Sequence, residues 1–345
     1  MGAAIYLEPR ESGFYDTLRA YYPDADFREI RPPVGGDVLY YSAYISREQL
    51  EAAQGLVERR TMVDGEVIEG IKRKTESVWM LQSDEGDAPF DVEWSGTLHI
   101  TRAGEYIFAL ESNSAATVLL DGTAILTEDR SQVKVVPSVG LHALEVRARV
   151  ENTDGALRLL WRQPPLQEND QPSGGEDAEE RAFEPIPVGN LYHGDVRPIG
   201  LAGRFFEAVD SVGSADDAIP DAMQVTPDIG GAFWYHSVIE GEHSSIWSGT
   251  LNVPESGLHR FSFGDVHGEM RLNIDGEVVI DTRASRDLEV ELAAGRHRIG
   301  LEYQTSVGSP RFEVLWAPPG RPKSRIGPEY LSPDAGYMFR VVDGS

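Results

Sequence analysis

Apolar and polar residues alternate along much of this chain, a pattern that predicts β-strands. The stretch "LEVRARV" (144–150) places four apolar side chains on one side and charged side chains on the other. The same alternation runs through residues 157–161, 298–303 and 312–316. A period of two puts one face of a strand in a core and the other in water.

Two Asp-Gly pairs indicate how such strands are joined. Asp121-Gly122 and Asp275-Gly276 both stand between apolar stretches, in "VLLDGTAIL" and "LNIDGEVVI". A two-residue type I′ hairpin needs positive φ at both central positions, which Asp-Gly adopts readily. Many short antiparallel strands with such turns predict a mainly β protein built as a sandwich or a barrel.

The pentapeptide "WSGTL" occurs twice, at 94–98 and at 247–251, and other residues match in the same order after it. The offset grows only from 153 to 155 positions along the series, which two small loop insertions explain. This ordered series predicts an internal duplication. The matched pairs include Trp94 with Trp247, Asp121 with Asp275, His142 with His297, and Trp161 with Trp316.

The order of these motifs resembles the PA14 domain. In each copy "WSGTL" is followed by a Gly-aromatic strand, then "L/I-D-G", then "G-x-H", then "L-W-x-x-P". The resemblance implies two tandem PA14-like β-sandwiches, at 56–198 and at 199–345 with its tail. It also implies a module that accompanies carbohydrate-active enzymes, adhesins and toxins, as a glycan-binding part or a spacer. We expect the four recurring tryptophans in the cores, and the glycine of "WSGTL" to allow a close approach or a bulge.

Two segments differ from the copies. Residues 1–55 predict a small β-α-β-α unit, in which "DVLYYSAYI" indicates a buried strand and Ser46 with Gln49 forms a capping box. Residues 166–184 hold seven acidic residues and one basic residue, which predicts a solvated linker inserted near the end of the first copy. After it, "PIPVGNLYHG" resembles "RIGPEYLSPD", so we expect each stretch to pack on its own sandwich.

The order of segments resembles the soluble C-terminal tails of some membrane glycosyltransferases. This resemblance implies an extracytoplasmic location, periplasmic or at the cell surface, and a membrane part that lies outside the present sequence. No stretch here is apolar enough to span a bilayer. The first residues also lack the basic and apolar regions of a signal peptide.

Composition excludes several function classes. The 345 residues carry a formal net charge of −26, which disfavours binding to nucleic acid or to anionic lipid. There is no cysteine, so disulfides, zinc-thiolate sites and cysteine nucleophiles are absent. The charge is compatible with simple solubility, adaptation to salt or a cation-binding surface.

No sequence motif predicts catalysis. The chain lacks G-x-S-x-G, H-E-x-x-H and the phosphate-binding glycine loops. A pair of carboxylates for glycoside hydrolysis cannot be located among 57 acidic residues from sequence alone. An unrecognised glycoside hydrolase therefore stays an alternative, and His142 and His297 are expected to have structural roles at strand starts.

Some residues are candidates for carbohydrate binding, because sugar sites combine aromatic faces with carboxylate and amide groups. In the PA14 family that the chain resembles, some lectins hold Ca²⁺ with two consecutive aspartates. Here the matching places are Leu120-Asp121 and Ile274-Asp275, with one aspartate each, so we expect no calcium cofactor. Trp79 and Trp234 are the candidates for exposed stacking platforms. The full candidate set is Asn113, Asp121, Asp265, Asp275, Trp79 and Trp234.

The sequence therefore favours a non-catalytic accessory region that contacts glycans or the cell envelope. The alternative from a different class is a structural spacer or a subunit of a surface assembly, since the paired-aspartate pattern is missing from both copies.

Overall fold

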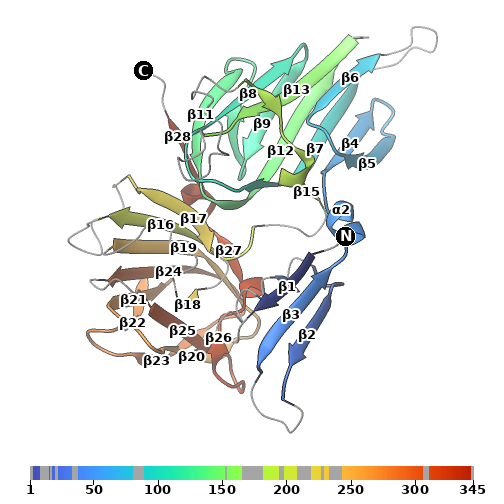
Figure 1. The fold of residues 1–345 in the computed structure, drawn as a ribbon. Coiled ribbons are helices and arrows are strands. Elements are labelled where there is room, and N and C mark those ends of the chain that lie inside the picture. Colours follow the sequence, from blue (N-terminus) through green and yellow to red (C-terminus); the bar gives the residue numbers. More distant parts are fainter. Residues whose placement is uncertain are drawn as a thin grey trace, which may run out of the picture. The chain divides into compact units, whose positions relative to one another are not determined.

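A computed structural model describes residues 3–7, 15, 18–19, 22–32, 38–80, 89–151, 154–164, 182–193, 198–207, 219–226, 229–232, 243–305 and 311–342. Most of them lie in β-strands, which confirms the predicted fold class (Figure 1). The chain divides into two compact units, one joining Ala53–Arg197 with Phe339–Ser345 and the other joining Met1–Ala52 with Pro198–Met338. In the part of the chain that is described, no helix is long and apolar enough to cross a membrane.

The first unit holds two sheets around one core, which we call the first sandwich. One sheet has the order β10-β9-β12-β7-β4-β5, and the short strand β15 also pairs with β7. Its strands are β4 (Leu56–Met62), β5 (Val67–Lys72), β7 (Phe90–Ile100), β9 (Ala115–Leu120), β10 (Thr123–Leu126), β12 (Gly140–Val150) and β15 (Leu191–Tyr192).

The other sheet of the first sandwich has the order β14-β13-β8-β11-β28, with β6 also paired to β13. Trp94 on β7 and Trp161 on β13 are fully buried between the two sheets, in the core where we expected them. The strands of this sheet are β6 (Glu76–Met80), β8 (Tyr106–Ser112), β11 (Gln132–Pro137), β13 (Asp154–Arg162), β14 (Glu184–Pro185) and β28 (Phe339–Val342).

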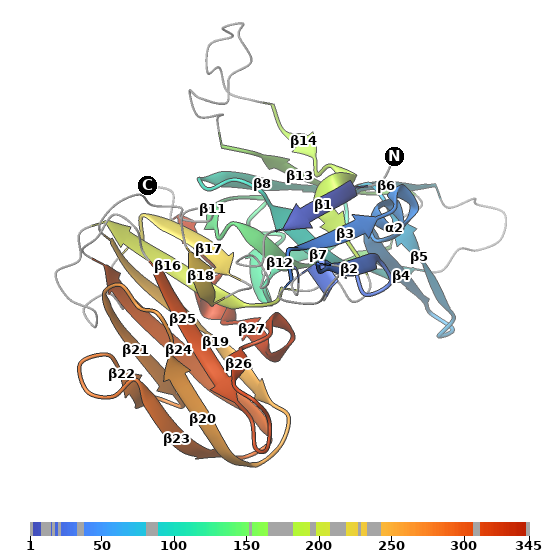
Figure 2. The same cartoon turned by 60° about the horizontal axis from the view of Figure 1, so that its bottom comes forward.

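The second sandwich is built from the Pro198–Met338 part of the other unit (Figure 2). Its sheets have the orders β17-β16-β19-β24-β21-β22, with β27 on β19, and β18-β25-β20-β23, with β26 on β25. The strands of the first of these sheets are β16 (Leu201–Glu207), β17 (Ala222–Thr226), β19 (His243–Val253), β21 (Glu269–Ile274), β22 (Glu277–Asp281), β24 (Gly295–Thr305) and β27 (Leu331–Pro333). Those of the second are β18 (Gly230–Ala232), β20 (Gly257–Phe263), β23 (Asp287–Leu292), β25 (Arg311–Ala317) and β26 (Ser324–Arg325).

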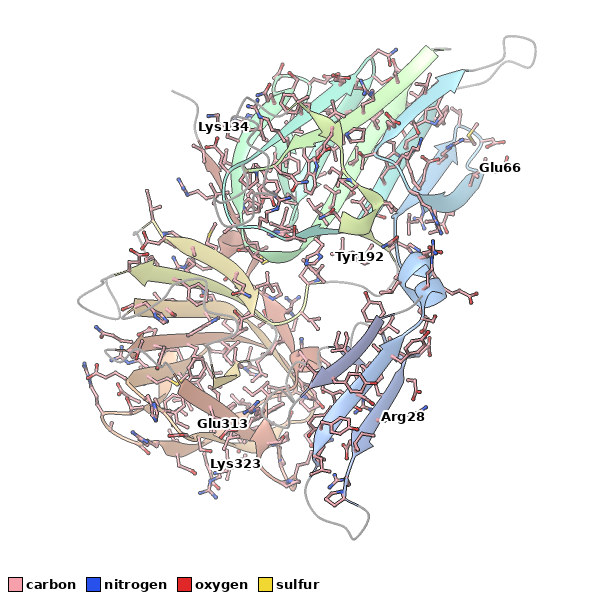
Figure 3. The ribbon with its side chains drawn as sticks, in the orientation of Figure 1. Arg28, Glu66, Lys134, Tyr192, Glu313 and Lys323 are labelled. Atoms are coloured by element: carbon pink, nitrogen blue, oxygen red, sulfur yellow. The ribbon has the colours of Figure 1, made fainter. Side chains whose placement is uncertain are left out.

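The two "WSGTL" pentapeptides lie in β7 and β19, near the middle of the larger sheet of each sandwich. A Cβ built on Gly96 would lie 2.4 Å from the carbonyl oxygen of Tyr192, and one on Gly249 would lie 2.3 Å from that of Ser332. Tyr192 belongs to β15 (Figure 3) and Ser332 to β27. The glycine therefore lets a short tail strand pair closely with the central strand, which agrees with the close approach expected from the sequence.

Each tail strand belongs to a segment that crosses from one sheet of its sandwich to the other. In the first sandwich β14 pairs with β13 and, after the 3-10 turn Val188–Asn190, β15 pairs with β7. In the second, β26 pairs with β25 and, after the turn Pro328–Tyr330, β27 pairs with β19. This confirms that the two similar stretches pack back on their own sandwiches. Of the predicted linker, residues 166–181 lie outside the described residues.

The N-terminal segment has one strand more than the predicted β-α-β-α order, whereas the helical residues Tyr15, Leu18 and Arg19 agree with the first predicted helix. It forms an antiparallel sheet, β1 (Ala3–Leu7), β3 (Tyr40–Ile45) and β2 (Asp26–Ile30), in the spatial order β1-β3-β2, followed by α2 (Arg47–Ala52). The sequence did not reveal β2, because "DFREI" is half charged. The prediction that β3 is buried is also wrong on one face, since Tyr44 is 49% exposed.

Other predictions for the N-terminal segment hold. Ser46 accepts a hydrogen bond from the Gln49 amide at 3.0 Å, and the Gln49 side chain accepts one from the Ser46 amide at 2.8 Å. This reciprocal pair is the predicted capping box.

The C-terminal strand corrects the predicted extent of the second copy. β28 pairs with β11 through four residues, from Lys134 opposite Val342 to Pro137 opposite Phe339, so it extends a sheet of the first sandwich. Phe339 and Val341 pack against the core of that sandwich. The open edge of β11 explains this placement, because an added strand satisfies its free backbone groups.

Candidate functional site

Each sandwich contains an Asp-Gly turn in which both residues adopt positive φ. Asp121 (φ 48°) and Gly122 (φ 80°) join β9 to β10, and Asp275 (φ 53°) and Gly276 (φ 87°) join β21 to β22. Two positive φ angles define the type I′ hairpin, so both predicted hairpins are confirmed.

The Asp121 carboxylate is held by the neighbouring strand β12. Its Oδ1 accepts a hydrogen bond from the Ala143 amide at 2.8 Å, and its Oδ2 lies 2.7 Å from Nδ1 of His142. The Asp121 side chain is 4% exposed and that of His142 is fully buried. Asp121 therefore stabilises its own turn, and His142 has the structural role that the sequence predicted.

Asp275 makes the same contacts in a more exposed setting. Its Oδ1 accepts from the Arg298 amide at 2.9 Å, and its Oδ2 lies 2.7 Å from Nδ1 of His297. Nε2 of His297 lies 2.8 Å from the Ala293 carbonyl oxygen, so both ring nitrogens face acceptors. A neutral imidazole donates from one nitrogen only, and this arrangement therefore favours the charged ring. The Asp275 side chain is 52% exposed, so it is reachable by a ligand, unlike Asp121.

The Asp275–His297 pair predicts a measurable pH dependence. Burial opposes protonation of His297, but its hydrogen bonds to Asp275 and Ala293 outweigh burial and raise the pKa above 6.5. For Asp275, burial opposes ionisation, yet the contacts with His297 and the Arg298 amide lower the pKa below 3.8. The histidine contribution to folding is complete below 6.5 and is lost as pH rises through the folded pKa. The aspartate contribution is complete above 3.8 and is lost as pH falls through its folded pKa.

A proton NMR titration of the His297 ring should therefore give a midpoint above 6.5, and Asp275→Asn should lower it. An unaltered His297 midpoint in the variant would contradict the assigned pairing.

Two further candidates lie in loops. Asn113 follows β8, and its Oδ1 accepts a hydrogen bond from the Ala156 amide of β13 at 2.7 Å, so its side chain fixes a turn. Asp265 lies between β20 and β21 with its side chain 54% exposed. Asn113 precedes β9 and Asp121 follows it, and Asp265 precedes β21 and Asp275 follows it, so within each sandwich the two candidates lie at opposite ends of one strand.

The prediction that Trp79 is an exposed stacking platform is wrong. Trp79 is 7% exposed, and its ring lies 6.0 Å from that of Phe90 and 6.5 Å from that of Trp94. It belongs to β6, whose pairing with β13 turns this side chain into the core of the first sandwich. Trp234, the other predicted platform, lies outside the described residues.

Metal binding has no candidate cluster in the described part of the chain. No group of three or more His, Asp or Glu side chains there is placed to hold a metal ion. The absence of a calcium cofactor stays a prediction, because the loop residues around Trp234 are not described.

A groove of about 490 Å³ lies on the solvent face of the larger sheet of the first sandwich. Its floor is formed by β4, β7, β12 and β9, and residues 127–129, between β10 and β11, complete its wall. Side chains that share this face are Arg59 and Thr61 of β4, Asp91 and Glu93 of β7, Arg147 and Arg149 of β12, and Ala115 and Thr117 of β9.

The strand register arranges these side chains in two rows across the sheet. One row runs Arg59, Glu93, Arg147, Thr117, and the next runs Thr61, Asp91, Arg149, Ala115. Neighbouring strands are about 4.8 Å apart. Guanidinium and carboxylate groups therefore alternate along the first row and adjoin in the second.

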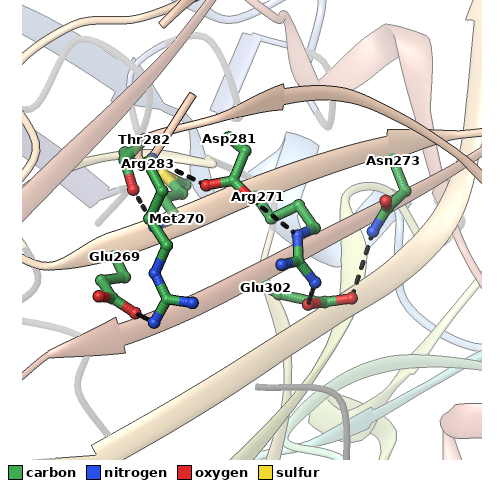
Figure 4. A network of polar contacts seen from close by, with 8 residues as sticks. All are labelled: Glu269, Met270, Arg271, Asn273, Asp281, Thr282, Arg283 and Glu302. Carbon is green, nitrogen blue, oxygen red and sulfur yellow. Dashed lines mark hydrogen bonds and ion pairs between the residues drawn. The ribbon is translucent and has the colours of Figure 1, made fainter. Parts of the chain in front are cut away.

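The same face of the second sandwich is filled by its own side chains (Figure 4). Arg271 of β21 pairs with Asp281 at 3.2 Å and with Glu302 of β24 at 3.3 Å. Glu302 also accepts a hydrogen bond from Asn273 at 3.3 Å. Arg283, in the loop after β22, pairs with Glu269. This network closes the surface at the strand positions that are open in the first sandwich.

Comparison with known families identifies part of the chain. The model of the PA14 domain matches residues 208–330. The second sandwich contains a PA14 domain. No curated protein matches the sequence.

Solved structures with low identity are similar over parts of the chain. An anti-sigma factor domain-containing protein from Clostridium clariflavum is 18% identical, with 81% of this chain and 100% of that chain covered and a TM-score of 0.33. A PA14 sugar-binding domain from an RTX adhesin is 14% identical, with coverage of 39% and 99% and a TM-score of 0.32. The Epithelial Adhesin 9 A domain from Candida glabrata, solved with Galβ1-4GlcNAc, is 14% identical, with coverage of 41% and 89% and a TM-score of 0.31.

The groove lies outside the matched PA14 domain and was missed by sequence reasoning. Its residues come from four strands and a loop, and nothing in any one strand marks them as a site. The available signal was the acidic polar side of "FDVEW" and the arginines on the polar side of "LEVRARV", the second of which we interpreted only as a solvent-facing surface.

Proposed function

We propose that this chain is a non-catalytic accessory region that binds glycans through the groove of the first sandwich. The open groove of about 490 Å³, lined by alternating guanidinium and carboxylate groups, is the observation that carries this proposal. Carboxylates accept hydrogen bonds from sugar hydroxyls and guanidinium groups donate to them, so the two rows suit a polyhydroxylated ligand.

The proposal includes three finer points. First, the first sandwich is a second PA14-like domain, supported by the ordered sequence matches and by the similar strand orders of the two sandwiches. Second, the region acts outside the cytoplasm, on glycans or cell-envelope components, which accords with the kind of adhesin in which PA14 domains occur. Third, it is the soluble tail of a membrane glycosyltransferase, an idea that rests on the order of its segments.

A glycan array with the whole chain tests the function. We expect binding that is the same in calcium and in a chelator, because the groove uses side chains rather than a metal. Thr117→Trp should abolish it by placing a large ring in the groove. Thr250→Trp, on the polar face of β19 in the second sandwich, serves as the matched control. An array with no bound glycan in either condition would overturn the proposal.

A structural spacer is the second candidate, favoured by the Asp–His pairs and the tail strands. The Asp121 side chain is 4% exposed and its carboxylate is hydrogen-bonded to β12. In each sandwich a tail segment also joins both sheets. These features stiffen each sandwich without presenting a ligand site. A chain that binds no glycan yet assembles into filaments or layers would support this candidate.

A further inference from the structure

The arginines and the carboxylates in the groove of the first sandwich differ in how they are paired within the protein. Each of its three arginines already has a carboxylate partner in the protein. Arg59 Nε donates to Glu69 at 2.7 Å, Arg149 donates to Asp91 at 2.9 Å, and Arg147 pairs with Glu145. The arginine charges in the groove are therefore largely neutralised.

Three carboxylates of the groove form no ion pair within 4 Å with any described residue, although the charge of Glu93 acts on Arg59 from a longer distance. Among the residues that the structure describes, none forms an ion pair with Glu93 of β7 or with Glu128 and Asp129 of the wall. Glu93 is partly buried within the first row, between Arg59 and Arg147, while Glu128 and Asp129 are exposed on the loop. A ligand in the groove thus meets carboxylates from the floor and from the wall.

Small side chains on β9 keep this groove open. Ala115 and Thr117 lie opposite Arg149 and Arg147 of β12, whereas on β21 of the second sandwich Glu269 and Arg271 lie opposite Gln304 and Glu302 of β24. In the second sandwich Glu269 pairs with Arg283, in the loop after β22, and Arg271 pairs with Asp281, the last residue of β22. The strand positions are equivalent, and the larger side chains on β21 are one of the differences between the filled face and the open face.

We propose that the groove of the first sandwich binds glycans that carry free amino groups, such as oligosaccharides of glucosamine. This deepens the proposed glycan-binding function and rests on it. An ammonium group donates three hydrogen bonds, and its positive charge can pair with the carboxylates of Glu93, Glu128 and Asp129. The ring hydroxyls of the same sugar fit the alternating rows. The net charge of −26 also attracts a cationic ligand over a longer range.

Matched oligosaccharides provide the test. The binding of a glucosamine hexamer, its fully N-acetylated form and a glucose hexamer to the whole chain is measured by calorimetry at moderate salt. We expect the glucosamine hexamer to bind at least tenfold more tightly than the other two. Acetylation removes the charge and keeps the ring, so the comparison isolates the amino group.

Variants locate the site. The double substitution Ala115→Glu with Thr117→Arg copies the residues of β21, fills the groove and leaves the net charge unchanged, so it should abolish binding without an electrostatic side effect. Glu93→Gln should weaken binding about tenfold. Glu289→Gln on β23 of the second sandwich removes the same charge outside the groove and should change nothing. Circular dichroism confirms that each variant is folded.

The outcomes separate the inference from the proposed function. Equal affinity for acetylated and free-amine hexamers overturns the amine preference and leaves glycan binding intact. Binding that survives both groove variants places the ligand elsewhere and overturns the inference. If no glycan binds on the array or in calorimetry, the proposed function is overturned as well.

Discussion

Replacing Gly249 by alanine is expected to destabilise the second sandwich by about 1–3 kcal/mol, the usual cost of inserting a methyl group into a packed site. The added Cβ would lie 2.3 Å from the Ser332 carbonyl oxygen and 2.6 Å from Cδ2 of Leu201. A backbone carbonyl on one side and a buried leucine on the other leave the methyl no space. The tail strand β27 must therefore move away from β19, which breaks its pairing at Gly249, Thr250 and Leu251.

Gly96→Ala tests the same contact in the first sandwich. Its Cβ would lie 2.4 Å from the Tyr192 carbonyl oxygen and 2.8 Å from Leu56, so a similar loss is expected. Gly300→Ala, on the neighbouring strand β24, is the control, because the atom nearest to its Cβ would be Cβ of Asn273 at 3.8 Å. Urea unfolding followed by tryptophan fluorescence measures all three. Equal stability of the Gly249 and Gly300 variants would show that the tail strand does not depend on the close approach.

The elements that could be predicted from the sequence are those determined by local patterns. Alternating strands such as "LEVRARV" and the Asp-Gly turns need only their own residues and one neighbouring strand. The glycine of "WSGTL" was expected to allow a close approach, and the structure supplies the partner, a tail strand. Such features follow from short-range chemistry, and they placed the four recurring tryptophans correctly in the cores.

The errors involve residues whose environment depends on distant strands. Trp79 stands in a short strand, and only the pairing of β6 with β13 turns it inward. β28 joins the first sandwich although more than 200 residues separate Val341 from its partner Val135 in the neighbouring strand. The groove likewise depends on the order of β4, β7, β12 and β9 in the sheet. Sequence patterns give the polar face of each strand but not which polar faces adjoin.

The turn aspartates illustrate how one motif serves two environments. Asp121 and Asp275 have similar φ angles, equivalent backbone partners and an equivalent histidine contact, yet their side chains are 4% and 52% exposed. The motif alone therefore could not distinguish a buried structural carboxylate from one that solvent or a ligand can reach. Burial separates the two roles, and it also makes the two positions a natural matched pair for mutation.

Asp121→Ala is expected to destabilise the first sandwich by about 2–4 kcal/mol. The substitution leaves the buried Nδ1 of His142 and the Ala143 amide without acceptors, at a cost of about 1–3 kcal/mol for each buried group that stays unsatisfied. It also forces alanine into the left-handed region at φ 48°, which adds about 1 kcal/mol or more. His142 is fully buried, so water cannot easily replace the lost carboxylate.

Asp275→Ala should cost clearly less, about 1–2 kcal/mol, because water can reach the exposed partners in the second sandwich while the backbone strain is the same. Asp121→Asn keeps an acceptor for the Ala143 amide and tolerates positive φ, so it should recover part of the loss. Thermal and urea unfolding of the three variants give the comparison. Equal losses for Asp121→Ala and Asp275→Ala would mean that backbone strain, rather than the buried hydrogen bonds to β12, dominates these turns.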